Sequence, residues 1–223
     1  MQRASAAPVL AELRHAFLDA QLAGDARAGV AVIERGLALG YDATTLRREL
    51  VRAGQETIGR LWQENRISVA REHMGTSVAL VALAHLYWRA PLSAPRHRRV
   101  LVSCVPGEQH AFPARLAADT LELEGYDVKF LGADVPRESL AGMVHDMKPD
   151  LVVLSVTLAF HLPELERTVS RIRELVPDVP IAIGGGACSD WAPVASRLGV
   201  IGAGRSAEEL LSMAEATFRG EQA

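Results

Sequence analysis

The chain has 223 residues, too few for a (β/α)₈ catalytic barrel, which needs about 250. With 49% hydrophobic and 23% charged residues it is expected to be globular, and its net charge of -3 gives no reason to expect nucleic acid as a partner. Cys104 and Cys188 are too few for a disulfide scaffold, and no apolar run reaches the roughly 18 residues of a membrane span. We therefore expect a cytoplasmic protein with no membrane attachment.

The first part of the chain, residues 8–90, is predicted to be helical throughout, because apolar residues recur at helical spacing. Asp25, Asp42 and Ser68 are suited to begin helices, since their side chains accept hydrogen bonds from the backbone amides of a first turn. Four helices joined by short links pack most simply as an antiparallel bundle. Residues 1–90 are therefore predicted to form a four-helix bundle.

A different pattern follows the segment 91–98, which contains two prolines and no apolar period and is predicted to be a linker. Short apolar segments, each followed by a stretch compatible with a helix, lie at 99–104, 127–132, 151–157, 181–186 and 200–204. This alternation predicts a five-stranded parallel sheet with helices on both faces. Residues 99–223 should thus form a Rossmann-like (flavodoxin-like) domain, and the chain as a whole has the fold class α + α/β.

Ligand-binding residues of such a sheet are expected just after its strands. Glu108 and His110 follow the first strand, beside the start of a helix. A helix N-terminus disfavours a cationic histidine and leaves a neutral imidazole able to bind a metal. Glu108 would accept the other ring N–H, as carboxylates beside metal-bound histidines do. Taken alone, the pair is a weak signal, because two polar loop residues are the more common explanation.

The third and fourth predicted strands also end in residues of interest. Ser155 and Thr157 end the third, and Gly184, Gly185 and Gly186 end the fourth. Three glycines would clear the sheet edge of side chains and let a bulky ligand approach the backbone, although a flexible turn is the alternative. Neither G-x-x-x-x-G-K-[ST] nor a G-x-G-x-x-G opening the first helix is present, so ordinary nucleotide binding loses its main support.

The separations between these segments are more specific than the segments themselves. Between Pro113 and Ser155 lie 41 residues, and between Thr157 and Gly184 lie 26. This resembles the cobalamin-binding domain, whose signature is D-x-H-x-x-G, S-x-L and G-G at such separations. The resemblance implies that His110 is the lower axial ligand of cobalt, in place of the corrinoid's own benzimidazole.

The same resemblance assigns roles to the other two segments. Ser155 and the Gly184–Gly186 segment would line the cleft that receives the displaced nucleotide tail. The chain departs from the signature at three positions, with Glu108 for Asp, Pro113 for Gly and Thr157 for Leu. Glutamate keeps the carboxylate and proline is tolerated near a helix start, so none of these changes forbids binding.

The helical half carries a second motif. Trp62 is followed after nine residues by Glu72 and His73, which share one face of the predicted fourth helix with Val69. This resembles the W-x₉-E-H motif of CarH-type cobalamin photoreceptors. The resemblance implies that these residues cap the upper face of cobalamin and hold the adenosyl group of adenosylcobalamin against cobalt. A core tryptophan beside a satisfied Glu–His pair is the alternative.

The resemblance implies a light sensor rather than an enzyme. Such a sensor responds to cleavage of the cobalt–carbon bond by a domain or oligomer change. The alternative is a corrinoid carrier that shuttles methyl groups between methyltransferases. Related repressors have an N-terminal DNA-binding domain, for which the residues before the first helix leave no room. We therefore expect the sensor part only, with no direct nucleic-acid contact, acting through a homo-oligomer or a separate effector protein.

Two further expectations concern the cofactor. Photocobilins, a branch of such photoreceptors, also bind a bilin, so biliverdin or a related bilin is a second expected chromophore. Gln63 stands where the repressors have a histidine that takes the upper cobalt site after photolysis. An amide is a poor cobalt ligand beside an imidazole, so His73 and water both stay open as the upper ligand in the light.

Overall fold

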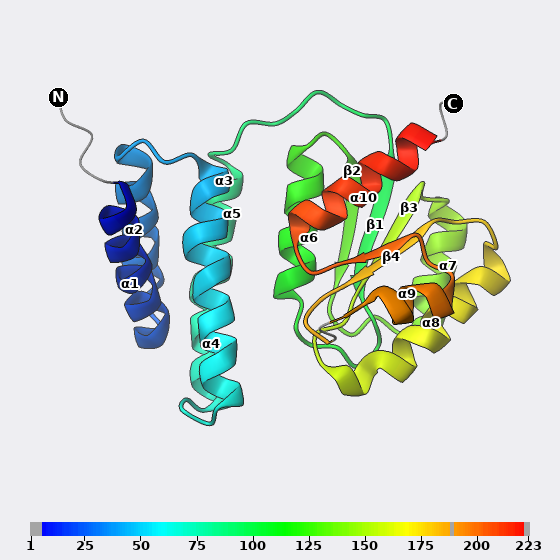
Figure 1. Ribbon diagram of the computed structural model, residues 1–223, viewed down its shortest axis with the longest axis horizontal. Coiled ribbons are helices and arrows are strands. Elements are labelled where there is room, and N and C mark those ends of the chain that lie inside the picture. The colour runs from blue at the N-terminus through cyan, green and yellow to red at the C-terminus, as the bar shows by residue number, and fades with distance from the viewer. Residues whose placement is uncertain (1–5, 188–189, 221–223) are drawn as a thin grey trace. The chain divides into compact units, whose positions relative to one another are not determined.

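A computed structural model describes residues 6–187 and 190–220 of the chain (Figure 1). These residues form two compact units that meet in the sequence between Pro91 and Leu92. The predicted order, a helical part followed by an α/β part, is confirmed. No helix in these described ranges is long and apolar enough to cross a membrane. Cys188 lies outside the described residues.

The first unit is built from helices, with a core that includes Phe17, Ile33, Leu46 and Ile58. Its third helix is continuous but has three parts, because a π-helical segment, η1, separates α3 from α4. The unit therefore contains the predicted four helices. Their bounds are α1 (Ala6–Ala23), α2 (Ala26–Ala38), α3 (Ala43–Leu46), η1 (Arg47–Arg52), α4 (Ala53–Gln63) and α5 (Val69–Tyr87).

Three of the predicted helix starts are confirmed by their capping hydrogen bonds. The Asp25 carboxylate accepts from the amide of Ala28 at 2.9 Å, and that of Asp42 accepts from Thr45 at 2.6 Å. The Ser68 hydroxyl accepts from the amide of Arg71 at 3.4 Å, directly before α5. These bonds satisfy amides that a helix leaves unpaired in its first turn.

The second unit contains a five-stranded parallel sheet with the order β2-β1-β3-β4-β5, as predicted. The third and fourth strands end at Ser155 and Gly184, two residues earlier than the apolar pattern suggested. The elements are β1 (Arg99–Cys104), α6 (Phe112–Leu123), β2 (Asp127–Gly132), α7 (Arg137–Met147), β3 (Leu151–Ser155), η2 (Ala159–His161), α8 (Leu162–Leu175), β4 (Ile181–Gly184), α9 (Ala192–Leu198), β5 (Gly202–Gly204) and α10 (Ala207–Gly220).

The helices of this unit cover both faces of the sheet (Figure 1). Helices α7, α8 and α9 pack on one face, where Leu101 of β1 and Leu154 of β3 join their buried side chains. Helices α6 and α10 contact each other and the sheet outside that cluster. The chain leaves β1 for β2 on one side and returns to β3 on the other, so the strand order reverses between β1 and β3. Ligands of doubly wound sheets bind at the carboxyl ends of the two strands at such a point.

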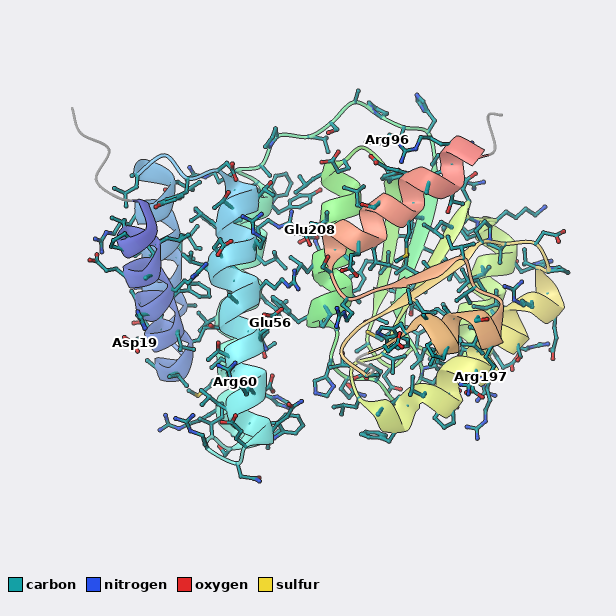
Figure 2. All side chains as sticks on the ribbon, in the orientation of Figure 1. Asp19, Glu56, Arg60, Arg96, Arg197 and Glu208 are labelled. Carbon is teal, nitrogen blue, oxygen red and sulfur yellow. The ribbon has the colours of Figure 1, made fainter. Side chains whose placement is uncertain are left out.

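The segment after Pro91 is irregular but attached to the second unit. The Ser93 amide donates to the carbonyl of Leu123 at 2.8 Å. The Arg96 guanidinium donates to Glu215 of α10 at 3.1 Å and lies 5.1 Å above the Tyr126 ring, and Figure 2 shows Arg96 where the segment passes α10. The predicted linker is therefore attached to this unit, although residues 91–97 are exposed.

Candidate functional site

The loop between β1 and α6 holds a histidine and a buried carboxylate together. Glu108 is fully buried, and its Oε1 lies 2.6 Å from Nδ1 of His110 and accepts from the His110 amide at 2.9 Å. Its Oε2 accepts from the amides of Thr157 and Leu158 at 2.8 and 3.1 Å. Each carboxylate oxygen therefore has two partners, and the loop after β1 is joined to the loop after β3.

These contacts decide the ionisation of Glu108 and the tautomer of His110. Burial alone raises the pKa of Glu108, but the hydrogen bonds from His110 and from the amides of Thr157 and Leu158 outweigh it and lower that pKa to about 2. A carboxylate can only accept, so Nδ1 of His110 carries the proton. The neutral ring then has its lone pair on Nε2, the tautomer in which histidine binds a metal.

Asp134, which sequence reasoning missed, anchors the same loop from the segment after β2. Its carboxylate accepts from the Gly107 amide at 2.7 Å and from Gln109 Nε2 at 3.0 Å. Its own amide donates to the carbonyl of Glu108 at 3.1 Å. The rule that predicted Glu108 and Ser155, a polar residue just after a strand, would also have selected Asp134.

The ends of β3 and β4 lie side by side, with Ser155 opposite Gly184 in the strand register. The Ser155 side chain is buried, and its hydroxyl oxygen has no hydrogen-bond partner among the residues that the structure describes. The same holds for the hydroxyl of Thr157. Buried hydroxyls normally find partners, so two unpaired ones at a sheet edge indicate a place for a polar ligand.

The three glycines at the end of β4 are present for different structural reasons. A Cβ on Gly184 would lie 2.6 Å from the carbonyl oxygen of Gly204. Gly185 has a φ of +110°, and a Cβ there would lie 2.1 Å from the carbonyl oxygen of Val156. Backbone packing therefore already requires both glycines, whereas a Cβ on Gly186 would make an ordinary contact of 3.5 Å with the Thr157 carbonyl. The predicted role of leaving room for a ligand therefore remains the main explanation for Gly186 alone among the three.

The thiol of Cys104 lies behind the histidine loop, 3.9 Å from the carbonyl oxygen of His110. Burial, and then the charge of Glu108, raise the pKa of this thiol to about 12. Cys104 is thus a buried core thiol rather than a reactive one.

The helical unit contains a second carboxylate–histidine pair. Glu72, in the first turn of α5, is 7% exposed, and its Oε2 lies 2.6 Å from Nδ1 of His73. The Thr76 hydroxyl donates to the other oxygen at 2.7 Å. The His73 ring and Val69 are exposed, while Trp62, next to the last residue of α4, is half-buried. The structure thus brings Glu72 and His73 together as a pair.

Sequence reasoning also missed the amides behind this pair. Gln55 of α4 donates to Thr76 Oγ1 at 2.5 Å and to Glu72 Oε1 at 3.4 Å. Gln21 of α1, fully buried, donates to Gln55 Oε1 at 3.3 Å. Glutamines in helices carry no sequence signal that separates them from ordinary surface residues.

The parallel sheet and its metal-competent histidine define a class of cofactor-binding domain, and comparison with known proteins identifies it. Residues 98–212 match the family described as B12 binding domain, and residues 13–87 match a second family of the same description. The chain belongs to the B12 binding domain family.

Individual relatives differ in what they do. The chain is 33% identical to the HTH-type transcriptional repressor CarH of Myxococcus xanthus over 144 residues, 64% of this chain and 48% of CarH, and so spans about half the length of that relative. It is 22% identical to trimethylamine corrinoid protein 1 of Methanosarcina acetivorans, over 96% of this chain and 99% of that protein. The structure of the Methanosarcina barkeri monomethylamine corrinoid protein has the same fold, with a TM-score of 0.81 at 19% identity over 91% of this chain and 97% of that one.

The residues present fit a cobalt corrinoid. A corrin ring supplies four nitrogens to cobalt, so the protein needs to add only an axial ligand. No cluster of three or more His, Cys, Asp and Glu side chains suited to a metal ion occurs in the described part of the chain, and His110 offers a single imidazole held by Glu108. The unpaired hydroxyls of Ser155 and Thr157 could bind the polar tail of such a cofactor.

Proposed function

We propose that the chain is a cobalamin-dependent light sensor that binds adenosylcobalamin with His110 as the lower cobalt ligand. The observation that carries this proposal over a methyl carrier is the Glu72–His73 pair on α5. A methyl group forms no hydrogen bonds, whereas an adenosyl group has hydroxyls and an amine that a carboxylate–imidazole pair can bind. When bound, adenosylcobalamin supplies a cobalt–carbon bond that visible light breaks.

Each element of the site would then have a defined task. Glu108 would keep the proton on Nδ1 of His110 and so leave Nε2 to coordinate cobalt. The hydroxyls of Ser155 and Thr157 would donate to the nucleotide tail, and the backbone of Gly184, Gly185 and Gly186 would line its path. The side chains Trp62, Val69, Glu72 and His73 would hold the adenosyl group.

The signal would be a domain or oligomer change. Contacts that depend on the adenosyl group favour one arrangement of the chain, and their loss shifts the equilibrium towards another. Either a second copy of this chain or a separate effector protein would read the change. Biliverdin or a related bilin, bound in addition, would extend the response to longer wavelengths.

The visible spectrum of the purified protein mixed with adenosylcobalamin, before and after green light, tests the proposal. We expect a light-dependent change in the spectrum and, by gel filtration, in the assembly. An unchanged spectrum, or binding of methylcobalamin alone, would contradict the light-sensor function. Biliverdin added to the same sample should produce a far-red band if the bilin proposal holds.

The lower ligand is tested by His110→Ala, with His145→Ala as the matched control. His145 is an exposed histidine whose Nδ1 lies 3.1 Å from the carboxylate of Asp146 in α7. We expect His110→Ala to bind cobalamin weakly and with its own benzimidazole on cobalt, whereas His145→Ala should match the natural sequence. An unaltered spectrum in His110→Ala would refute the assignment.

A corrinoid carrier that shuttles methyl groups between methyltransferases is the second candidate. It is favoured by the similarity to trimethylamine corrinoid protein 1, which extends over nearly the full length of both chains. A carrier should bind methylcobalamin at least as tightly as adenosylcobalamin. The ratio of the two dissociation constants in the dark therefore separates the candidates.

A further inference from the structure

A series of side-chain hydrogen bonds crosses the helical unit from α1 through α4 to α5. The Gln21 amide nitrogen donates to Gln55 Oε1 at 3.3 Å and to the carbonyl oxygen of Gly75 at 3.2 Å. The Gln55 amide nitrogen donates in turn to Thr76 Oγ1 at 2.5 Å and to Glu72 Oε1 at 3.4 Å. All three helices therefore contribute to the environment of one carboxylate.

The chemistry of these groups fixes the direction of every bond. A carboxylate only accepts, so the single hydroxyl hydrogen of Thr76 points at Glu72 Oε1, 2.7 Å away. The Thr76 oxygen must then accept from the amide nitrogen of Gln55, which turns the Gln55 oxygen towards the Gln21 nitrogen. Each donor in the series thus points towards Glu72.

Gln21 is in an unfavourable position for a residue with only a packing role. Its side chain is fully buried, and its Oε1 has no hydrogen-bond partner among the described residues. That oxygen lies against Gly54, where a Cβ would be only 2.2 Å away. A buried amide with an unpaired oxygen destabilises the folded state, so an apolar side chain would suit the bundle better. What an apolar residue could not supply is the amide hydrogens of Gln21, which donate the first hydrogen bonds of the series.

The most exposed group of the series is the ring of His73. Glu72 Oε2 lies 2.6 Å from Nδ1 of His73, and the His73 side chain is 73% exposed whereas that of Glu72 is 9% exposed. Because the carboxylate accepts from Nδ1, a neutral ring carries its lone pair on Nε2. The exposed end of the series is therefore a hydrogen-bond acceptor.

We propose that Gln21 and Gln55 are positioning residues that fix Glu72, so that His73 presents an acceptor nitrogen and selects a ligand group rich in hydrogen-bond donors. A nucleoside, with its hydroxyls and amine, meets this requirement, and a methyl group does not. The choice of nucleoside rests on the proposed function, whereas the tautomer of His73 is a property of the protein alone.

The tautomer is tested by ¹⁵N NMR of the full chain with labelled histidine, with His73→Ala to assign the signal. We expect the neutral His73 ring of the natural sequence to be protonated mainly on Nδ1. Gln55→Met, which keeps the length of the side chain but removes its hydrogen bonds, should shift the ring towards a mixture of tautomers. Thr57→Val is the matched control, since the Thr57 hydroxyl donates within α4, to the carbonyl of Ala53 at 3.0 Å.

Gln21→Met distinguishes positioning from mere structural support. We expect this variant to melt at the same temperature as the natural sequence or higher, because it removes the unpaired oxygen, and yet to shift the His73 tautomer. If Gln55→Met fails to fold, Thr76→Val and Thr76→Ser replace it, since only serine keeps the hydroxyl that connects Gln55 to Glu72. An unchanged tautomer in the folded variants would overturn the proposal.

Ligand selection is tested by the dissociation constants of adenosylcobalamin and methylcobalamin in the dark. The loss of one hydrogen bond between the ligand and His73 should lower the preference for the adenosyl form about tenfold in Gln55→Met and Gln21→Met, and leave it unchanged in Thr57→Val. A preference unchanged in the folded Gln variants would overturn the selection claim. If the natural sequence bound neither cobalamin, the proposed function would fail, while the NMR result would still decide the positioning of His73.

Discussion

Glu108 and Glu72 contact a histidine Nδ1 at the same distance, 2.6 Å, but the two carboxylates are themselves held by different kinds of group. Glu108 is fixed by the backbone amides of Thr157 and Leu158, at the carboxyl edge of the sheet. Glu72 is fixed by side chains of α4 and α5. The Glu108 pair is part of the strand and loop geometry, and the Glu72 pair is assembled from replaceable residues.

This difference has a functional consequence. A ligand that every member of a family must hold is best placed by the backbone, because a single substitution elsewhere cannot move it. A contact that selects between related ligands is better placed by side chains, which can change one at a time. We therefore expect His110 to determine whether cobalamin binds and His73 to determine which form binds.

Removing the carboxylates should give the largest effect and separate the two regions most clearly. Glu108→Ala leaves three partly buried backbone amides, those of His110, Thr157 and Leu158, and the His110 ring without their acceptor, so the free energy of unfolding should fall by about 4 kcal/mol. Glu72→Ala exposes its donors at the edge of the bundle, where water can replace the carboxylate, and should cost about 1 kcal/mol. Urea unfolding of the cobalamin-free chain measures both. Equal losses would show that the two pairs are held with equal strength.

The glycines after β4 test how strictly the backbone defines this edge. Gly185→Ala should lower the free energy of unfolding by about 3 kcal/mol, because it combines a positive φ with a Cβ only 2.1 Å from the Val156 carbonyl oxygen. Gly186→Ala should change stability by less than about 0.5 kcal/mol and instead weaken cobalamin binding. A stability loss at Gly186 matching that at Gly185 would leave no evidence that Gly186 makes room for a ligand.

Acid should weaken the backbone-held pair over a defined range. The pKa of Glu108 is lowered from 4.5 to about 2, so the ionised group stabilises the fold fully above pH 4.5 and loses that contribution as the pH falls to about 2. The loss should reach about 2 to 3 kcal/mol, measured as the pH dependence of urea unfolding. Asp42 and Glu164, whose pKa values are also lowered, respond in the same direction. The Glu108→Gln variant retains Asp42 and Glu164. The difference between its acid dependence and that of the natural sequence therefore measures the contribution of Glu108, and we expect the variant to depend less on pH.

Patterns with a local physical cause were predictable from the sequence. The capping residues Asp25, Asp42 and Ser68 act within one turn of their helices, and the five strands follow from apolar runs between turn signals. The π-helical segment at Arg47–Arg52 was not predicted, because a single wider turn hardly disturbs the spacing of apolar residues. Glu108 and His110 could be paired in advance because they are two residues apart on one loop.

Contacts between distant segments were not predictable in the same way. Gln21 and Gln55 lie 34 residues apart, and only the packing of α1 against α4 brings their amides together. Asp134 reaches the loop after β1 because β1 and β2 are neighbours in the sheet, although it lies 27 positions after Gly107 in the sequence. The sequence also could not show that Gly184 and Gly185 are required by backbone packing. An unpaired hydroxyl such as that of Ser155 can be recognised only once its surroundings are known.

Ser155→Ala should have the smallest effect on stability and the most informative one on binding. Its hydroxyl has no partner among the described residues, so removing it should change the free energy of unfolding by less than about 0.5 kcal/mol or even raise it. Cobalamin affinity should fall about fivefold, the value of one neutral hydrogen bond, because the cofactor tail loses a donor. Ser103→Ala is the control, since the Ser103 hydroxyl already donates to the carbonyl of Cys104 at 2.9 Å. Ser103→Ala should lose stability but keep its affinity for cobalamin. If instead Ser103→Ala lost affinity and Ser155→Ala lost only stability, the cofactor would bind elsewhere than at the ends of β3 and β4.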